Sequence, residues 1–96
     1  MPDVQDAIKV VTDPANLVGA GDRHTGERAV NETRAVRALR EQGAGKAEAR
    51  ALIREAAQEL GGRVDSEVRF AGRATGPDTK TAVEIWYVPT TAIRSS

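Results

Sequence analysis

The sequence predicts an α+β fold in which two or three helices are followed by a C-terminal antiparallel β-hairpin. Residues 46–60 repeat apolar side chains at helical spacing. Residues 64–70 alternate between apolar and polar positions, and in residues 83–87 Val, Ile and Tyr recur at every second position, which is the pattern of strands. Glycines mark turns at residues 43–45 and 61–62. These patterns order the chain as helix, turn, helix and hairpin.

The composition is that of one small folded domain over residues 1–96. Hydrophobic residues make up 40% of the chain and charged residues 29%. The chain has no cysteine and one histidine, which excludes disulfides, a thiol nucleophile and a cysteine-type zinc site, so we expect no metal and no cofactor. No apolar run approaches about 18 residues, and the N-terminus lacks the regions of a signal peptide. We therefore expect a cytoplasmic protein without a membrane partner.

The first part of the domain, residues 1–26, is expected to hold a short helix and a glycine-containing loop. Residues 4–11 place apolar side chains at helical spacing after Asp3, a favourable N-cap, although their β-branched residues would also suit a strand. Pro14 ends this helix, because the residue before a proline disfavours helical geometry. In the loop 13–26, Leu17 and Val18 are expected to anchor the chain to the core. A loop of this length is either mobile or functional, or it contains a short helical turn.

Residues 27–60 are predicted to form two helices joined by a tight turn. The first is expected over residues 27–42, with Thr25 as its N-cap, and it is supported by two i,i+4 charge pairs, Arg28–Glu32 and Arg37–Glu41. Its apolar face is interrupted by charges, so the helix is partly exposed or uses a second face against a partner. Gly43 ends it by adopting the left-handed conformation.

The second helix, residues 46–60, sorts its side chains by chemistry. At about 100° per residue its apolar positions fall in one sector, a basic stripe lies beside them, and acidic residues form a third sector. Ala47 and Ala51 flank the basic stripe and leave room for another surface to come close. Such a stripe is as often simply a solvated face. The apolar sector is Ala49, Leu52, Ile53, Ala56 and Leu60; the basic stripe is Lys46, Arg50, Arg54 and Gln58; the acidic residues are Glu48, Glu55 and Glu59.

The last third of the chain reads as a β-hairpin over residues 63–89, followed by a tail over residues 90–96, of which residues 93–96 are expected to be frayed. The connection at residues 72–80 is polar, rich in turn-forming residues and basic. It carries Arg73 and Lys80. Pro89 ends the second strand.

Signatures of enzymes and nucleotide-binding proteins are incomplete. Gly45-Lys46 lacks the preceding glycine and the following Ser or Thr of a phosphate-binding loop, and the glycines at 19, 21 and 26 do not have dinucleotide-binding spacing. The lone His24 beside Asp22 is typical of a solvated loop, and no catalytic triad is visible. The sequence therefore predicts no catalytic residues and a non-enzymatic protein.

The order of elements resembles that of the winged-helix family of DNA-binding domains. The resemblance covers residues 27–89 and is carried by REQGAGKAEARALIREAAQELGG, followed by VDSEVRF and TAVEIWYVP. It is similar to small phage and plasmid regulators and replication proteins. The resemblance implies that the helix before the hairpin enters the major groove and that the hairpin, the wing, touches the DNA backbone. A helix before the pair is also usual in the family, and here only residues 4–11 can supply it.

The resemblance places six residues on double-stranded DNA. Lys46 lies at a helix N-terminus, which favours a phosphate. Arg50 suits a guanine edge, and Gln58 suits adenine. The residues that the resemblance assigns to DNA binding are Lys46, Arg50, Arg54 and Gln58 on the helix, with Arg73 and Lys80 on the wing.

Three hypotheses of different kinds remain, and the first two have more support from the sequence. The first is a small non-enzymatic DNA-binding regulatory protein, active in transcription regulation, that uses the helix 46–60 and the wing 72–80. The alternative is a protein–protein interaction module, such as a phage-type inhibitor, an adaptor or a dimeric assembly protein, that uses the exposed second helix and the hairpin edge. A formal net charge of zero favours the alternative, because DNA-binding domains are usually basic. An enzyme, with a pocket around Asp22 and His24, ranks third.

Overall fold

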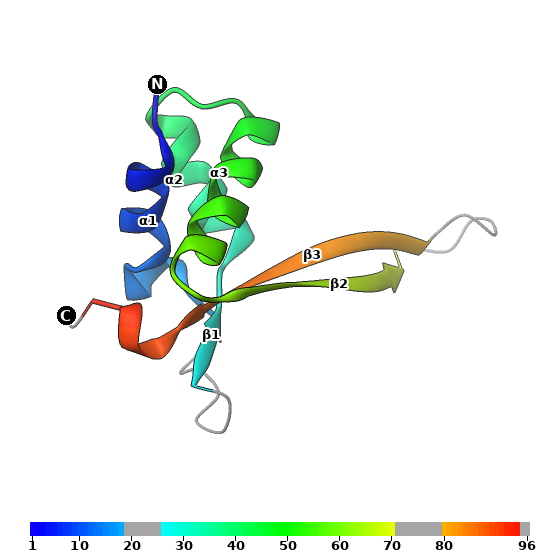
Figure 1. Ribbon diagram of the computed structural model, residues 1–96. Coiled ribbons are helices and arrows are strands. Elements are labelled where there is room, and N and C mark those ends of the chain that lie inside the picture. Colours follow the sequence, from blue (N-terminus) through cyan, green and yellow to red (C-terminus); the bar gives the residue numbers. More distant parts are fainter. Residues whose placement is uncertain (19–25, 71–79, 95–96) are drawn as a thin grey trace.

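The computed structural model describes residues 1–18, 26–70 and 80–94, and for residues 67–70 and 80–83 it describes the backbone path alone. Three helices pack together on one side of a three-stranded antiparallel sheet, and two of its strands extend away from the helices as a long hairpin (Figure 1). The predicted α+β class is confirmed. The elements in chain order are α1 Val4–Val11, β1 Glu27–Ala29, α2 Glu32–Glu41, α3 Lys46–Glu59, β2 Arg63–Phe70 and β3 Lys80–Pro89, with 3-10 turns at Pro14–Asn16 and Thr90–Ala92.

The first segment is a helix and not a strand. The Asp3 carboxylate accepts hydrogen bonds from the backbone N–H groups of Gln5 and Asp6, and the Asp6 carboxylate accepts from the backbone N–H of Asp3 at 2.9 Å. This reciprocal cap satisfies N–H groups that the first turn leaves unpaired. The backbone hydrogen bond from Asp6 is the largest cause that lowers the pKa of the Asp3 carboxyl below its usual value.

The segment after α1 contains the short helical turn that its length suggested. Residues Pro14–Asn16 form a 3-10 turn, capped by the Asp13 carboxylate, which accepts from the backbone N–H of Ala15 at 3.0 Å. Leu17 is buried and bridges to Val30, so its predicted anchoring role is confirmed. Val18, by contrast, is 51% exposed, and the prediction that it anchors the loop is wrong. Residues 19–25, with Asp22, His24 and the predicted cap Thr25, lie outside the described residues.

The predicted helix 27–42 is wrong in its first part. Residues Glu27–Ala29 form strand β1, which pairs antiparallel with the end of β3, Arg28 opposite Val88. The helix starts only after Asn31, whose side-chain oxygen caps it by accepting from the backbone N–H of Arg34 at 3.1 Å. Because Arg28 lies on a strand, its spacing from Glu32 is not a helical i,i+4 spacing. Pairing with β3 outweighs the weak local helical preference of these residues.

The turn between α2 and α3 has the glycine geometry that the sequence predicted. Gly43 has a φ of +108°, a value that glycine adopts without strain, and the turn buries Ala44 in the core. Gly45 is the N-cap of α3, and its backbone N–H donates to the Glu48 carboxylate at 3.3 Å. The predicted helix 46–60 is confirmed, with Leu60 as its C-cap.

The sheet has the order β1-β3-β2, so β3 is the central strand. The predicted hairpin 63–89 is confirmed, with a register that runs from Arg63 opposite Tyr87 to Phe70 opposite Lys80. On β3, Trp86 and Val88 are buried against the helices, whereas Ile85 and Tyr87 are half-buried on the other face. The largest fully buried side chains come from α1, α2, α3 and β3 and are Trp86, Leu39, Ile53, Val11 and Val88.

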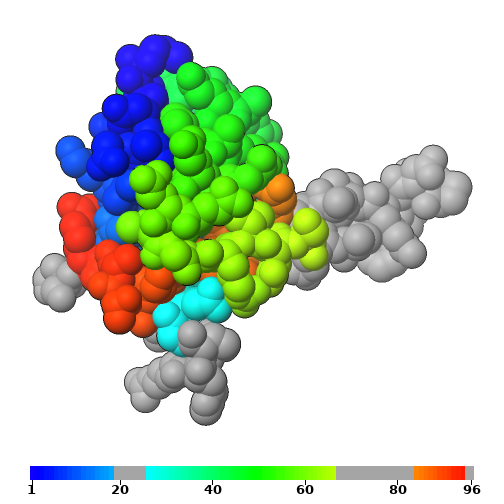
Figure 2. Space-filling model, in the orientation of Figure 1, coloured from blue at the N-terminus to red at the C-terminus, as the bar shows by residue number. Residues whose placement is uncertain are grey.

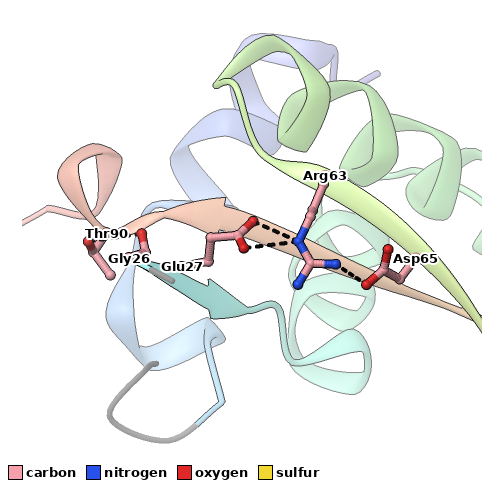
Figure 3. A network of polar contacts seen from close by, with 5 residues as sticks. All are labelled: Gly26, Glu27, Arg63, Asp65 and Thr90. Atoms are coloured by element: carbon pink, nitrogen blue, oxygen red, sulfur yellow. Dashed lines mark hydrogen bonds and ion pairs between the residues drawn. The ribbon is translucent and has the colours of Figure 1, made fainter. Parts of the chain in front are cut away.

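On the outer face of the sheet, the Arg63 side chain contacts residues of all three strands (Figure 3). The Arg63 Nε atom donates to both carboxylate oxygens of Glu27, at 2.9 and 3.1 Å, and its Nη1 atom donates to Asp65. The guanidinium carbon lies 4.1 Å from the centre of the Tyr87 ring. The bond to Glu27 is the largest cause that raises the pKa of Arg63 above its usual value. Arg63 thus joins β2 to β1 across the central strand.

The predicted fraying of residues 93–96 is wrong for its described part, Ile93 and Arg94, and the residues before them are held as well. The backbone N–H of Thr90 donates to the Gly26 carbonyl at 2.8 Å, and the backbone N–H of Arg94 donates to the Thr12 carbonyl at 2.8 Å. Ile93 packs against the core. The tail is held because these backbone groups find partners on α1 and at the start of β1. Within the described ranges, no helix has the length and apolar character needed to cross a membrane.

Candidate nucleic-acid interface

Helix α3 lies at the front of the helical layer, and much of the surface seen in Figure 2 belongs to it. Its buried positions are Ala49, Ile53, Ala56 and Ala57, while Leu52 and Leu60 are half-buried. The predicted apolar sector is therefore confirmed, with Ala57 in addition. The exposed positions are Lys46, Ala47, Glu48, Ala51, Arg54, Glu55, Gln58 and Glu59.

Arg54 joins α3 to the central strand. Its Nε and Nη2 atoms both donate to Oε1 of Glu84, at 2.9 and 2.7 Å. The same oxygen accepts a third hydrogen bond from Nε1 of Trp86 at 3.2 Å. These contacts keep the pKa of the Glu84 carboxyl below its usual value, and the hydrogen bonds from Arg54 are the largest cause. Glu84 is therefore a carboxylate at neutral pH, and it offsets the charge of Arg54.

Arg50 lies one helical turn before Arg54, and its side chain is more buried than that of Arg54. Its guanidinium carbon is 5.9 Å from the centre of the Trp86 ring, within range of a cation–π contact. Its Nε atom is 3.4 Å from the Glu32 carboxylate on α2, and the side chain is 36% exposed. Arg50 thus links α3, α2 and the buried tryptophan, which is the placement of a structural residue.

Lys46 stands in the first turn of α3, beside an open hollow between α2 and α3. The charged side chains of this hollow are mixed in sign, with three cations and two carboxylates. Its lining residues are Glu32, Thr33, Val36, Arg37, Arg40, Glu41 and Lys46. The cations Arg37, Arg40 and Lys46 are all exposed, so they contribute positive potential at the N-terminal end of α3.

The predicted basic stripe is thus a real spatial feature, but its members have different surroundings. Lys46, Arg54 and Gln58 are exposed, whereas Arg50 is partly buried. Arg73 lies outside the described residues, and Lys80 is the first residue of β3 with only its backbone described. The wing half of the predicted site therefore has no described side chain.

Sequence reasoning missed the acidic partners of the stripe, Glu84 and Glu32. Glu84 follows the strand alternation onto the face that carries Trp86 and Val88. A charged residue on a core-facing position requires a partner, and this was the signal that could have revealed it. The partner could not be named, because Arg54 is 30 residues away in the sequence.

The described part of the chain brings together no group of three His, Asp or Glu side chains of the kind that holds a metal ion. Comparisons with protein-family models, with curated proteins and with solved structures find no match to the chain. A function for this surface therefore has to be argued from its geometry.

Proposed function

We propose that the protein is a small, cytoplasmic, non-enzymatic DNA-binding regulator of the winged-helix type. In this proposal α3 enters the major groove and the β2–β3 hairpin is the wing. The observation that carries the proposal is one strip of the exposed side of α3, where the small or basic side chains Lys46, Ala47, Ala51 and Arg54 lie. The ion pair between Arg54 and Glu84 joins this strip to a strand of the projecting hairpin.

The arrangement of elements supports the proposal. The helices α2 and α3 are joined by a four-residue turn, residues 42–45, and α1 supplies the preceding helix that the resemblance requires. Helix α3 packs against both α1 and the sheet, while the hairpin extends past it (Figure 1). A helix and a strand pair that project side by side suit a groove and the adjacent backbone.

The chemistry of the exposed side of α3 supports it as well. The major groove is about 12 Å wide and admits one α-helix. Ala47 and Ala51 are exposed and small, so the backbone of α3 can approach the bases closely. Lys46 lies in the first turn, where the helix dipole and unpaired N–H groups favour a phosphate. Glu48, Glu55 and Glu59 lie on the neighbouring side of α3. Their negative charges would be repelled by the DNA phosphates and would so orient the helix in the groove.

The test is a titration of labelled random-sequence duplex DNA at two salt concentrations. We expect the wild type to bind, and Lys46→Ala to weaken binding and to reduce the slope of log affinity against log salt by about 0.9, the loss of one phosphate contact. Lys9→Ala is the matched control, because Lys9 is an exposed lysine on α1 and its loss changes the net charge equally. A wild type without affinity for any duplex at low salt, or equal effects of the two variants, would contradict the proposal.

A second candidate function, the protein-interaction module, is favoured by the open edge of β3. Strand β1 pairs with β3 only at residues 87–89, followed by one bond from the Val30 N–H to the Trp86 carbonyl. Among the described strands, β3 between Lys80 and Ile85 is paired on the β2 side alone. Such an edge can add a strand from a partner. Light scattering and a pull-down from nuclease-treated lysate test it; a monomer without a protein partner would count against it.

A further inference from the structure

We infer that Arg54 reads a guanine in the major groove and that Glu84 is the positioning residue that makes this reading specific. The inference rests on the proposed DNA-binding function and deepens it. It assigns a base-reading role to one arginine of the stripe and a role in recognition to an acidic residue on the neighbouring strand.

The geometry of the pair leaves the correct edge of the guanidinium available. Glu84 occupies the side edge, because its Oε1 atom accepts from both Nε and Nη2 of Arg54. The end edge, formed by Nη1 and the outer N–H of Nη2, has no hydrogen-bond partner among the described residues. That edge presents two parallel N–H donors, and guanine presents two neighbouring acceptors, O6 and N7, in the major groove. Adenine offers an acceptor and a donor there, so it does not match.

Glu84 is itself held in place, so it can fix the orientation of Arg54. The indole N–H of Trp86, which is 1% exposed, donates to the same carboxylate oxygen. Both residues belong to the central strand, which is paired with β2 from Lys80 to Tyr87. An arginine that is already ordered loses less conformational entropy when it binds a base.

The charge balance also assigns Arg54 to a base and not to a phosphate. An arginine paired with a carboxylate contributes little net positive charge, so it attracts the phosphate backbone weakly. The N–H groups of Arg54 that do not donate to Glu84 remain directional donors, and base reading depends on such donors. Arg50 is less suited to this role, because it is half-buried against Trp86 and faces Glu32.

The experiment starts with selection of preferred sites from randomised duplexes by the wild-type protein. Affinities are then measured for the selected duplex and for duplexes in which one guanine is replaced by adenine or by 7-deazaguanine, which lacks the N7 acceptor. We expect the wild type to prefer guanine over adenine at one position by roughly 5- to 150-fold. Arg54→Lys keeps the positive charge but loses the two parallel N–H donors of the guanidinium. It should therefore reduce the guanine preference to less than about threefold and leave the salt slope unchanged.

Glu84→Gln gives a signature that a purely structural role would not produce. Removing the carboxylate charge frees the charge of Arg54, so we expect tighter binding to random DNA, a salt slope steeper by up to about 0.9, and a loss of guanine preference. The preference is a ratio of two affinities of one preparation, so it does not depend on the fraction of folded variant. Lys46→Ala is the control that should lower affinity and keep the preference.

The outcomes separate this inference from the proposed function. If the wild type binds DNA but selects no guanine, or if Glu84→Gln keeps the preference, the inference is overturned and the DNA-binding proposal stands. If the wild type binds no duplex, both fall together.

Discussion

Replacing Gly62 with alanine places a methyl group against the central strand. Gly62 connects α3 to β2, and a Cβ atom built on it would lie 1.9 Å from the Tyr87 carbonyl oxygen and 3.0 Å from the Ala57 carbonyl oxygen. Ordinary contacts of a Cβ atom begin at 3.4 Å, so the first distance is too short by 1.5 Å. The clashing atoms belong to the backbones of β3 and α3, and no side-chain rotation can move them away.

The size of the effect follows from this geometry. Overpacking a core costs typically 1–3 kcal/mol when neighbouring side chains can adjust. Here β2 must move away from β3 or from α3, so we expect the free energy of unfolding to fall by about 3 kcal/mol or more. For a domain of this length each kcal/mol corresponds to roughly 4–8 °C, so the Tm should fall by about 12–24 °C.

Thermal and urea unfolding followed by circular dichroism measure this change. Gly45→Ala is the matched control, because a Cβ atom at Gly45 meets nothing within 4 Å. It should cost less than about 1 kcal/mol, the difference between glycine and alanine at an N-cap. If Gly62→Ala is as stable as Gly45→Ala, the close contact of the α3–β2 connection with β3 is wrong.

Three further predictions test other parts of the structure by chemical or thermal unfolding. Leu39→Ala should cost about 2–5 kcal/mol, because Leu39 is fully buried, whereas Val18→Ala should cost little. Gly45→Ser should stabilise the protein by a few tenths of a kcal/mol by adding the side-chain cap that α3 lacks. The pKa of Glu84 is lowered from 4.5 in the fold, so its stabilising effect is present above pH 4.5 and is lost as the pH falls through the folded pKa. The stability difference between wild type and Glu84→Gln should therefore shrink on acidification; a difference that is constant from pH 7 to 3 would contradict the Arg54–Glu84 pair.

The helices that the sequence predicted correctly are those with strong local signals. Helix α3 has an apolar sector over four turns and glycines at both ends. The pattern of α1 would also suit a strand, and there the reciprocal cap at Asp3 and Asp6 favours the helix. Strand β1 has no comparable signal, because three residues are too few to display an alternation. It exists because residues 87–89 offer hydrogen bonds from the far end of the chain. The local sequence does not reveal this pairing with β3, so it favours a helix at residues 27–29.

The sequence also does not decide which face of β3 is buried, because the alternation along this strand gives no single apolar face. Both faces of the strand are apolar, with Ile85 and Tyr87 on one side and Trp86 and Val88 on the other. Arg63 covers Tyr87 on the outer face, so an aromatic residue is tolerated there. Because the face was undecided, Glu84 could not be placed next to Arg54. The basic stripe was predictable from helical spacing, whereas its neutralising partners depend on the orientation of a strand about 30 residues away.

The most direct measurement of the central claim is a titration of isotope-labelled protein with duplex DNA, followed by backbone amide chemical shifts. We predict that the shifts concentrate on α3 from Lys46 to Gln58 and on the adjoining hairpin strands, while α1 and residues 90–94 stay unchanged. Shifts confined to α1 or to the exposed surface of α2, or no shifts at all, would contradict the assignment of α3 as the DNA-binding helix.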